Sequence, residues 1–304
     1  MIFRSGHNVQ IVLYSYNRAM QLDAALRSFF LHCRDSDQIN RIAVIFKTRG
    51  ALHNRQYETL KEYYGNRYPV VFIPETDFRQ NSLDVIRSQL PAEKWKYILE
   101  FFNPTAFTLQ LVDDNLFVRP FSILDACRTL RRKRSVLNFS LRLGGNICYS
   151  YTKNCQITPP TFKNIGDGIL EYRWPGKDDS FGYPMDISSS VYRTVDLFVL
   201  EKMIAFHSPN SLEGRLNVRV KKLAKVIPVH KISCYRTSVA FCAPINRVQD
   251  EVKNRASGIT DYSADSLAQL FEEGYRIDIE SFENFTAMSC HKEVEVHFTK
   301  DKDF

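Results

Sequence analysis

Two adjacent carboxylates and an amide, Asp113, Asp114 and Asn115, interrupt the apolar stretch LQLVDDNLFVRP at residues 109–120. Asp and Asn side chains often bond to their own backbone in turns, so the triplet could simply close a turn after a strand. Carboxylate oxygens are also the ligands that hard divalent cations prefer, and a bound cation neutralises a diphosphate. These residue types leave both interpretations open, and their place in the fold decides between them.

The segments around this triplet predict an α/β fold. Short, almost wholly apolar strands are expected at residues 9–15, 41–46, 69–73, 107–112 and 135–141. Strands that are hydrophobic on both faces are typical of a parallel sheet covered by helices. Apolar residues at helical spacing fill the intervals, which predicts a helix after an Asn17 N-cap and others near residues 53–64, 77–89, 93–102 and 120–134. The alternation indicates an open, doubly wound, mostly parallel sheet flanked by helices.

In doubly wound sheets, ligands bind at the carboxyl ends of the strands, where the strand order reverses. The segment YSYNR (14–18) follows the first expected strand and Asp113-Asp114 follows the fourth, so both should lie at this edge. No G-x-G-x-x-G follows the first strand and no G-x-x-x-x-G-K-[ST] occurs, which disfavours a dinucleotide-binding domain and a P-loop NTPase. The position therefore favours a cation, held by carboxylates, as the means of binding phosphate.

Composition indicates an ordinary globular protein of 304 residues. The seven cysteines are odd in number and scattered, with no C-x-x-C pair, so neither a disulfide framework nor a structural zinc site is expected. The N-terminal segment lacks the apolar core of a signal peptide, and no stretch approaches the roughly 18 apolar residues of a membrane span. We expect a soluble, cytoplasmic protein, which leaves open a peripheral contact with the inner face of a membrane.

The formal net charge of +7 is concentrated in two basic clusters, at residues 128–134 and 219–225. A solvated helix face is the simplest interpretation of such a cluster, and an anionic membrane or a phosphorylated ligand is the alternative. Aromatic residues are not interleaved with these clusters, and no zinc finger or helix-turn-helix motif occurs. Nucleic acid is therefore not an expected partner.

Three segments, in this order, resemble the nucleotide-sugar-dependent glycosyltransferases of the GT-A fold, in particular the family 2-like bacterial enzymes. The stretch IVLYSYNRAMQLDAALRSF is similar to the nucleoside-binding opening of that family. LVDDNLFVRP is similar to its Asp-x-Asp or Asp-Asp element, and SPNSLEGRLN (208–217) to its Glu-bearing loop and helix. The resemblance covers residues 9–217, and CAPINRVQDEV (242–252) adds a further similarity.

The resemblance implies a metal-dependent transfer of a sugar from a nucleotide-diphosphate donor to a hydroxyl group of a glycan or lipid-linked acceptor, as in the assembly of surface polysaccharides. Asp113 would approach the ribose, and Asp114 would help to coordinate Mn²⁺ or Mg²⁺ at the diphosphate. The residues that would line the nucleoside pocket are Ser15, Tyr16, Asn17 and Arg18. Many relatives carry an acidic residue after the second strand, where this chain has Lys47-Thr48-Arg49, so the identity of the nucleobase stays open.

Glu213 is the candidate general base, with inversion as the expected stereochemistry. The acceptor hydroxyl must lose a proton as it attacks the anomeric carbon, and a carboxylate within hydrogen-bond reach accelerates that loss. Asn210 precedes Glu213 by three residues, so the pair could instead form a helix capping box. Both roles are compatible with one position.

The second half of the chain, from residue 146 onward, is richer in turns. We expect one continuous domain, with a nucleotide-sugar-binding half at 1–145 and an acceptor-side half with a C-terminal cap at 146–304. Asp186 and Tyr192 are acceptor-side candidates, whereas the Gly-flanked pair Asp178-Asp179 is interpreted as a solvated loop. A helix that starts at a Ser263 N-cap and stops at Gly274, and an edge strand in KEVEVHF (292–298), should complete the cap.

Three other functions remain open from the residues alone. A nucleotidyltransferase also combines an α/β sheet with metal-bound phosphates, although the Gly-rich signature it usually carries is absent here. A GT-A-like module could bind its ligand without turnover. A basic scaffold could dock on anionic lipid through residues 128–134. The isolated histidines His207, His230 and His291 are interpreted as structural residues.

Overall fold

The computed structural model describes residues 7–246 and 262–300, and its centre is a nine-stranded sheet in the order β3-β2-β1-β4-β11-β6-β12-β10-β9. Its first four strands are mutually parallel: β1 (Asn8–Tyr16), β2 (Ile39–Lys47), β3 (Val70–Pro74) and β4 (Ala106–Val112). The order 3-2-1-4 places the reversal of strand order between β1 and β4. The expected α/β class is therefore confirmed.

The other side of the sheet is mixed. β11 is antiparallel to both β4 and β6, β12 is parallel to β6, and β10 is antiparallel to β12 and β9. These strands are β6 (Val136–Ser140), β9 (Lys163–Gly166), β10 (Ile169–Arg173), β11 (Ser190–Arg193) and β12 (Lys231–Tyr235). Because β11 pairs with β4, residues from the second half of the chain lie beside the carboxyl end of β4.

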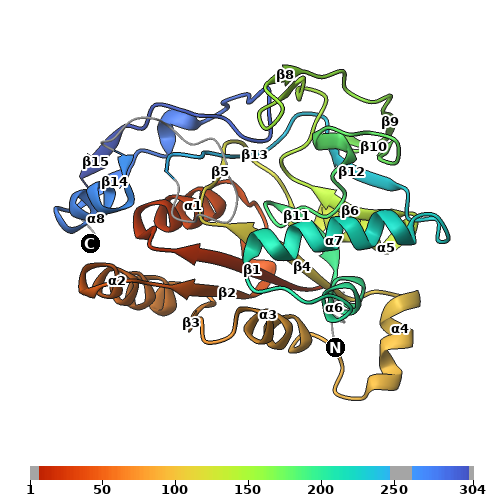
Figure 1. Cartoon of the computed structure of the whole chain (residues 1–304), viewed down its shortest axis with the longest axis horizontal. Coiled ribbons are helices and arrows are strands. Elements are labelled where there is room, and N and C mark those ends of the chain that lie inside the picture. Colours follow the sequence, from red (N-terminus) through yellow and green to blue (C-terminus); the bar gives the residue numbers. More distant parts are fainter. Residues whose placement is uncertain (1–6, 247–261, 301–304) are drawn as a thin grey trace.

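Helices cover both faces of the sheet (Figure 1). Side chains alternate along a strand, so Ile11 and Leu13 of β1 enter one apolar cluster and Val12 and Tyr14 the other. The first cluster packs against α1 (Ala19–His32), α2 (Ala51–Arg67), α5 (Ile123–Arg132) and α8 (Ala264–Glu272). The second packs against α3 (Phe78–Arg87), α6 (Thr194–Lys202) and α7 (Pro209–Leu223). A short helix, α4 (Tyr97–Phe102), precedes β4.

Three small two-stranded sheets support the loops at one end of the central sheet. β5 (Asn115–Phe117) pairs with β13 (Ala240–Cys242), β7 (Tyr149–Ser150) with β8 (Cys155–Gln156), and β14 (Tyr275–Ile277) with β15 (Phe298–Lys300). The β5–β13 pair matters most for function, since it places Cys242 opposite Asn115, directly after the two acids.

Two local expectations are wrong. Asn17 is not the N-cap of α1; its backbone is left-handed, with φ of 53°, and its Oδ1 accepts a hydrogen bond from the backbone N–H of Arg49 at 2.7 Å. In the segment 292–298, only Phe298 belongs to a strand, because the pairing with β14 starts there. The C-terminal helix is as expected: Ser263 accepts from the N–H of Ser266, and Gly274 has φ of 84°.

No helix within residues 7–246 and 262–300 is long and apolar enough to cross a membrane. All seven cysteines lie in this part of the chain and are free thiols.

A buried carboxyl group links α6 to the central sheet. The Oε1 atom of Glu201 accepts from Gln110 at 2.9 Å and Oε2 accepts from Ser82 at 3.0 Å, while Ser82 also contacts the Tyr14 hydroxyl. Burial raises the pKa of Glu201 to about 8, so this carboxyl carries a proton at neutral pH.

The raised pKa of Glu201 makes the stability of the fold pH-dependent. Below pH 4.5 the carboxyl group is protonated in both the folded and the unfolded state. Between pH 4.5 and about 8 only the unfolded state has released the proton, so the free energy of unfolding falls over this range. Glu201→Gln removes this titration; its Oε1 can still accept from Gln110, while its amide N–H donates to the Ser82 hydroxyl. We measure the urea midpoint of unfolding for the variant and for the parent. We expect the variant's midpoint minus the parent's midpoint to increase from pH 5 to pH 9.

The matched control is Glu62→Gln, at an exposed position of α2. The difference between its urea midpoint and that of the parent should stay constant over the same pH range. A Glu201→Gln curve that runs parallel to the parent curve would show that Glu201 does not titrate as described.

Candidate functional site

A cleft of about 920 Å³ lies at the carboxyl ends of the parallel strands, a size that suits a drug-sized or nucleotide-sized ligand. Seven of the predicted site residues line it: Ser15, Tyr16, Arg18, Asp113, Asp114, Asp186 and Glu213. Asn17 and Tyr192 do not. The structure thus brings together residues that are up to about 200 positions apart in the chain, in one hollow beside the strand reversal.

Asp113 is held by the residues that follow β1. Its Oδ2 accepts hydrogen bonds from Ser15 Oγ at 2.9 Å and from the backbone N–H of Tyr16 at 3.2 Å. Its Oδ1 pairs with Arg18 Nη1 at 3.0 Å. Arg18 in turn donates from Nε to the side chain of Asn246 at 2.9 Å. Asp113 is therefore a fixed, charge-balanced carboxylate, oriented to accept a further hydrogen bond from a ligand.

Asp114 differs from its neighbour in having an unsatisfied oxygen. Its Oδ1 is buried and has no hydrogen-bond partner in the part of the chain that the structure describes. Burial raises the pKa of Asp114 to about 6, against the attraction of Arg18 and with the repulsion of Asp113. An orphaned acceptor in a cleft is a natural ligand for a cation.

The Asn115 side chain stabilises the turn after β4. Its Oδ1 accepts from the backbone N–H of Val112 at 2.9 Å, and its Nδ2 donates to Cys242 Sγ at 3.1 Å. The amide closes the turn after β4 and ties it to β13. The interpretation as a turn residue therefore holds for Asn115. Asp113 instead accepts hydrogen bonds from the end of β1, and Asp114 has an oxygen without a partner in the cleft.

The donor set fits a divalent cation in one specific way. Among residues 7–246 and 262–300, no three His, Cys, Asp or Glu side chains form a ready metal cluster. Mg²⁺ is commonly held by one or two carboxylates, with water and substrate phosphate completing the shell. Asp114 supplies one such carboxylate, so a cation here would depend on a bound phosphate ligand.

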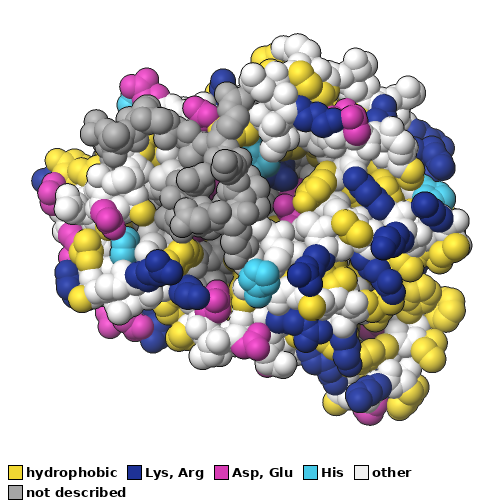
Figure 2. All heavy atoms as spheres, in the orientation of Figure 1, with side chains coloured by type: hydrophobic (Ala, Val, Ile, Leu, Met, Phe, Trp, Pro, Cys, Tyr) yellow, Lys and Arg dark blue, Asp and Glu magenta, His cyan; other side chains and the backbone are white. Residues whose placement is uncertain are grey.

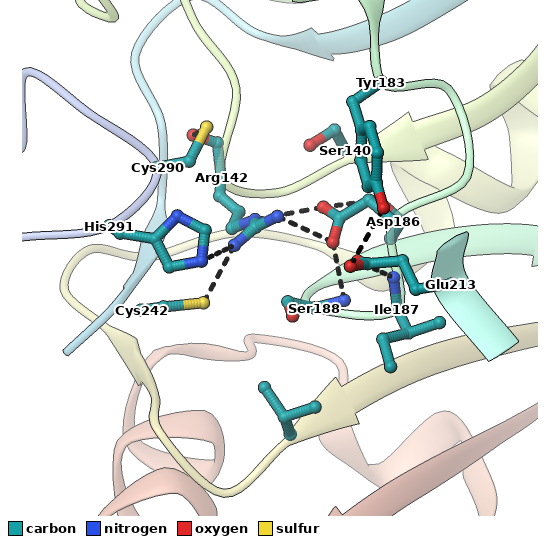
Figure 3. A network of polar contacts seen from close by, with 12 residues as sticks. Ser140, Arg142, Tyr183, Asp186, Ile187, Ser188, Glu213, Cys242, Cys290 and His291 are labelled. Carbon is teal, nitrogen blue, oxygen red and sulfur yellow. Dashed lines mark hydrogen bonds and ion pairs between the residues drawn. The ribbon is translucent and has the colours of Figure 1, made fainter. Parts of the chain in front are cut away.

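A buried ion pair forms part of the floor of the cleft (Figure 3). Arg142 contacts both oxygens of Asp186, with Nη2 to Oδ1 at 2.7 Å and Nε to Oδ2 at 3.0 Å. Arg142 Nη1 also lies 2.9 Å from Cys242 Sγ and 3.2 Å from His291 Nε2. Burial and the Arg142 charge lower the pKa of His291 to about 3, so its imidazole is neutral.

Tyr192 holds the backbone of Asp186 in place. Its hydroxyl donates to the backbone carbonyl of Asp186 at 2.7 Å and lies 2.9 Å from the Asp186 N–H. The side chain is 1% exposed and does not reach the cleft. Of the two acceptor-side candidates, only Asp186 has access to a ligand.

Glu213 projects from α7 beside Asp186 (Figure 3). Its Oε1 accepts from the backbone N–H of Ile187 at 3.1 Å, and its Oε2 accepts from the Tyr183 hydroxyl at 3.4 Å. Burial and the nearby charge of Asp186 raise the pKa of Glu213 to about 8. A carboxyl group with such a pKa is mostly protonated at neutral pH and is a strong proton acceptor once it is deprotonated.

The alternative interpretation of Asn210 and Glu213 as a capping box does not hold. α7 is capped by Ser208, whose side chain accepts from the N–H of Ser211, while the Ser211 side chain accepts from the Ser208 N–H. Glu213 lies beyond the first turn of the helix. Its side chain is therefore available to the cleft.

Sequence reasoning missed Arg142 and Glu75. Arg142 directly follows an expected strand, in LRLGG, and a charged residue at a strand's carboxyl end was a usable signal. Glu75 follows β3 and lies 3.4 Å from Lys47 Nζ, so an acid and a cation together line the cleft beyond β2. His291, expected to be structural, also lines the cleft.

The loop with Asp178 and Asp179 borders the cleft without entering its polar network. Asp178 is paired with Lys153 and its side chain is 89% exposed, while Asp179 accepts from the N–H of Phe181 at 2.8 Å. The interpretation as a solvated loop is consistent with both contacts. In the similar segment 242–252, residues 247–252 lie outside the described residues.

Comparison with known proteins finds one curated relative at significant similarity. The bifunctional glycosyltransferase pgtA of Dictyostelium discoideum is 24% identical over 312 residues, which cover 95% of this chain. The chain spans only 38% of the length of that relative. No protein-family model matches. The expected resemblance to glycosyltransferases is confirmed by this relative.

Solved structures of similar fold include S. aureus TarS 1–349 in complex with UDP-GlcNAc, at 12% identity and a TM-score of 0.47, covering 84% of this chain and 63% of that chain. GalNAc-T7 with UDP, GalNAc and Mn²⁺ has 9% identity and a TM-score of 0.46, covering 76% of this chain and 44% of that chain.

The Arg142–Asp186 pair should be essential for stability. Arg142→Met leaves a buried carboxylate without its partner, which costs about 3 to 5 kcal/mol of unfolding free energy in comparable cases. We expect a loss of this size by urea denaturation, and we expect Arg142→Met/Asp186→Asn to recover most of it.

Arg132→Met, at an exposed position near the end of α5, is the matched control and should change stability by less than about 0.5 kcal/mol. A single Arg142→Met variant as stable as this control would contradict the pairing.

Proposed function

We propose that this chain is a metal-dependent glycosyltransferase unit that moves a sugar from a nucleotide-diphosphate donor to a hydroxyl acceptor. The observation that carries the proposal is the pair Asp113 and Asp114 at the strand reversal, one fixed by Arg18 and the other with an unsatisfied oxygen in a nucleotide-sized cleft. The glycosyltransferase relative, which matches 95% of the chain, supports the same reaction class.

On the donor side, Asp113 is placed to accept a hydrogen bond from a ribose hydroxyl, because Ser15, Tyr16 and Arg18 hold its carboxylate in one orientation. Asp114 would hold Mg²⁺ or Mn²⁺. When bound, that cation stabilises the negative charge of the departing nucleoside diphosphate. The Arg49 guanidinium lies 5.7 Å from the centre of the Tyr16 ring, so a cation and an aromatic face border the nucleoside end of the pocket.

On the acceptor side, Glu213 takes the proton of the attacking hydroxyl. The Ile187 N–H and the Tyr183 hydroxyl orient its carboxylate, and burial together with the charge of Asp186 increases its proton affinity. Arg142 neutralises Asp186 and keeps both acids compatible with burial. Attack by a hydroxyl activated in this way, opposite the leaving diphosphate, inverts the anomeric configuration.

The proposal extends to the acceptor and to the location of the protein in the cell. The acceptor is a glycan or a lipid-linked sugar, in the assembly of a surface polysaccharide or another glycan. The site is cytoplasmic, with peripheral contact at the inner face of a membrane. The proposed reaction class does not depend on the acceptor or on the location.

A nucleotide panel tests the donor site. We expect one of UDP, GDP, CMP and dTDP, at about 100 times its Kd, to raise the free energy of unfolding by about 2.7 kcal/mol when Mn²⁺ is present, and by less without it. Asp114→Asn should lose the metal-dependent part of the thermal shift. Asp178→Asn, at the exposed rim, is the control and should keep it. A chain that none of these nucleotides stabilises, with or without Mn²⁺, would rule out this donor site.

The pH profile tests the base. Because Glu213 works deprotonated and its pKa is about 8, turnover should rise as the pH increases through about 8. Glu213→Gln should reduce kcat by about 10²-fold or more while the nucleotide-induced thermal shift stays unchanged. The control is Glu62→Gln.

Full turnover in Glu213→Gln would remove Glu213 from the mechanism, and NMR of the product anomer separates inversion from retention. Nucleotide binding without any transfer would favour a noncatalytic binding module.

A further inference from the structure

A patch of large apolar side chains around α4 is exposed at the edge of the molecule opposite the cleft. Figure 2 shows hydrophobic side chains gathered at the lower right, where α4 lies, with Lys and Arg side chains beside them. Within eight consecutive residues, five large apolar side chains have exposed fractions of 49% to 75%: Trp95, Ile98, Leu99, Phe101 and Phe102. We call these five residues the α4 patch.

The acidic side chain within α4 does not interrupt the patch. Glu100 is 8% exposed and turns inward, where its carboxylate accepts hydrogen bonds from the backbone N–H groups of Thr105 and Ala106. The helix therefore presents its apolar side chains to solvent and keeps its acid for the loop that enters β4. Contiguous apolar surface of this kind marks an interaction site on a soluble protein.

Cationic side chains border the patch, and two of them are also ion-paired, Lys96 with Glu93 at 2.8 Å and Arg134 with Asp196 at 3.4 Å. Lys96 Nζ lies 5.5 Å from the centre of the Trp95 ring, and the Arg134 guanidinium lies 4.3 Å from the centre of the Phe101 ring. Arg131 donates to Asn103 Oδ1 at 3.1 Å, so the basic end of α5 is packed beside the end of α4. Two further cationic side chains are exposed: Lys94, which directly precedes Trp95, and Arg132, the last residue of α5.

We propose that the α4 patch and the basic end of α5 together dock the protein on an anionic lipid surface. Trp and Phe side chains enter the boundary between headgroups and acyl chains favourably, and adjacent Lys and Arg side chains are attracted to anionic headgroups. The charge complementarity favours this occupant over a second copy of the chain, because two such basic faces would repel each other.

Docking in this manner leaves the cleft accessible. α4 immediately precedes β4, so it lies at the amino end of a strand whose carboxyl end carries Asp113 and Asp114 (Figure 1). The membrane-facing edge and the ligand-binding edge are thus opposite ends of the same strands. The donor and a soluble glycan acceptor would reach the site from the aqueous side, so docking in this orientation favours the glycan over a lipid-linked sugar as the acceptor.

Vesicle co-sedimentation of the full chain tests the proposal, and its readout does not depend on turnover or on a donor. We expect binding to vesicles of phosphatidylcholine mixed with phosphatidylserine, weak binding to phosphatidylcholine alone, and loss of binding as salt rises. Trp95→Ser/Phe102→Ser and, separately, Lys94→Glu/Arg132→Glu should each weaken binding by about tenfold or more.

The matched controls lie on other helices. Leu31→Ser removes an apolar side chain of α1 that is 54% exposed, and Lys61→Glu reverses an exposed charge of α2. Both should bind vesicles like the parent. Failure of the parent to bind anionic vesicles would overturn the proposal, as would equal binding by the Trp95→Ser/Phe102→Ser variant. Self-association that the same variant abolishes, without vesicle binding, would assign the patch to a second copy.

Discussion

The candidate site depends on the balance of buried charge in one cleft. Arg18 and Arg142 lie close to four of the carboxyl groups that line this cleft: those of Asp113, Asp114, Asp186 and Glu213. Burying a carboxylate without a partner is costly, and each arginine pairs with one acid: Arg18 with Asp113 and Arg142 with Asp186. The other two acids have no such ion pair, and burial raises the pKa values of Asp114 and Glu213 to about 6 and about 8.

This division assigns different chemistry to the two ends of the cleft. Excess negative charge can be relieved by a cation or by a proton. Asp114, beside the fixed Asp113 and with an unsatisfied oxygen, suits a cation that arrives with a phosphate ligand. Glu213, oriented by a backbone N–H and a tyrosine hydroxyl, suits a proton taken from a hydroxyl group. The same lack of counter-charge would serve both steps of the proposed transfer reaction.

Several residues near the site act on its geometry rather than on a ligand. Asn115 closes the turn that presents the acid pair, Tyr192 holds the backbone of Asp186, and Asn17 fixes the loop after β2 through the Arg49 N–H. At the other end of the strands, the α4 patch provides a surface for docking. The sheet therefore separates chemistry, at its carboxyl edge, from attachment, at its amino edge.

The α/β class, the parallel strands and the meeting of the Ser15 and Asp113 segments at one edge could all be predicted from the sequence, because apolar periodicity and strand polarity are local properties that the chain carries with it. The partners of the acids could not. Arg142 meets Asp186 across 44 positions, and Arg18 meets Asn246 across 228. Which acid is neutralised, which keeps an orphaned oxygen and which gains a proton depend on burial and on these long-range pairs. Only the packing of the tertiary structure creates them, because the pKa of a carboxyl group is set by its surroundings in space.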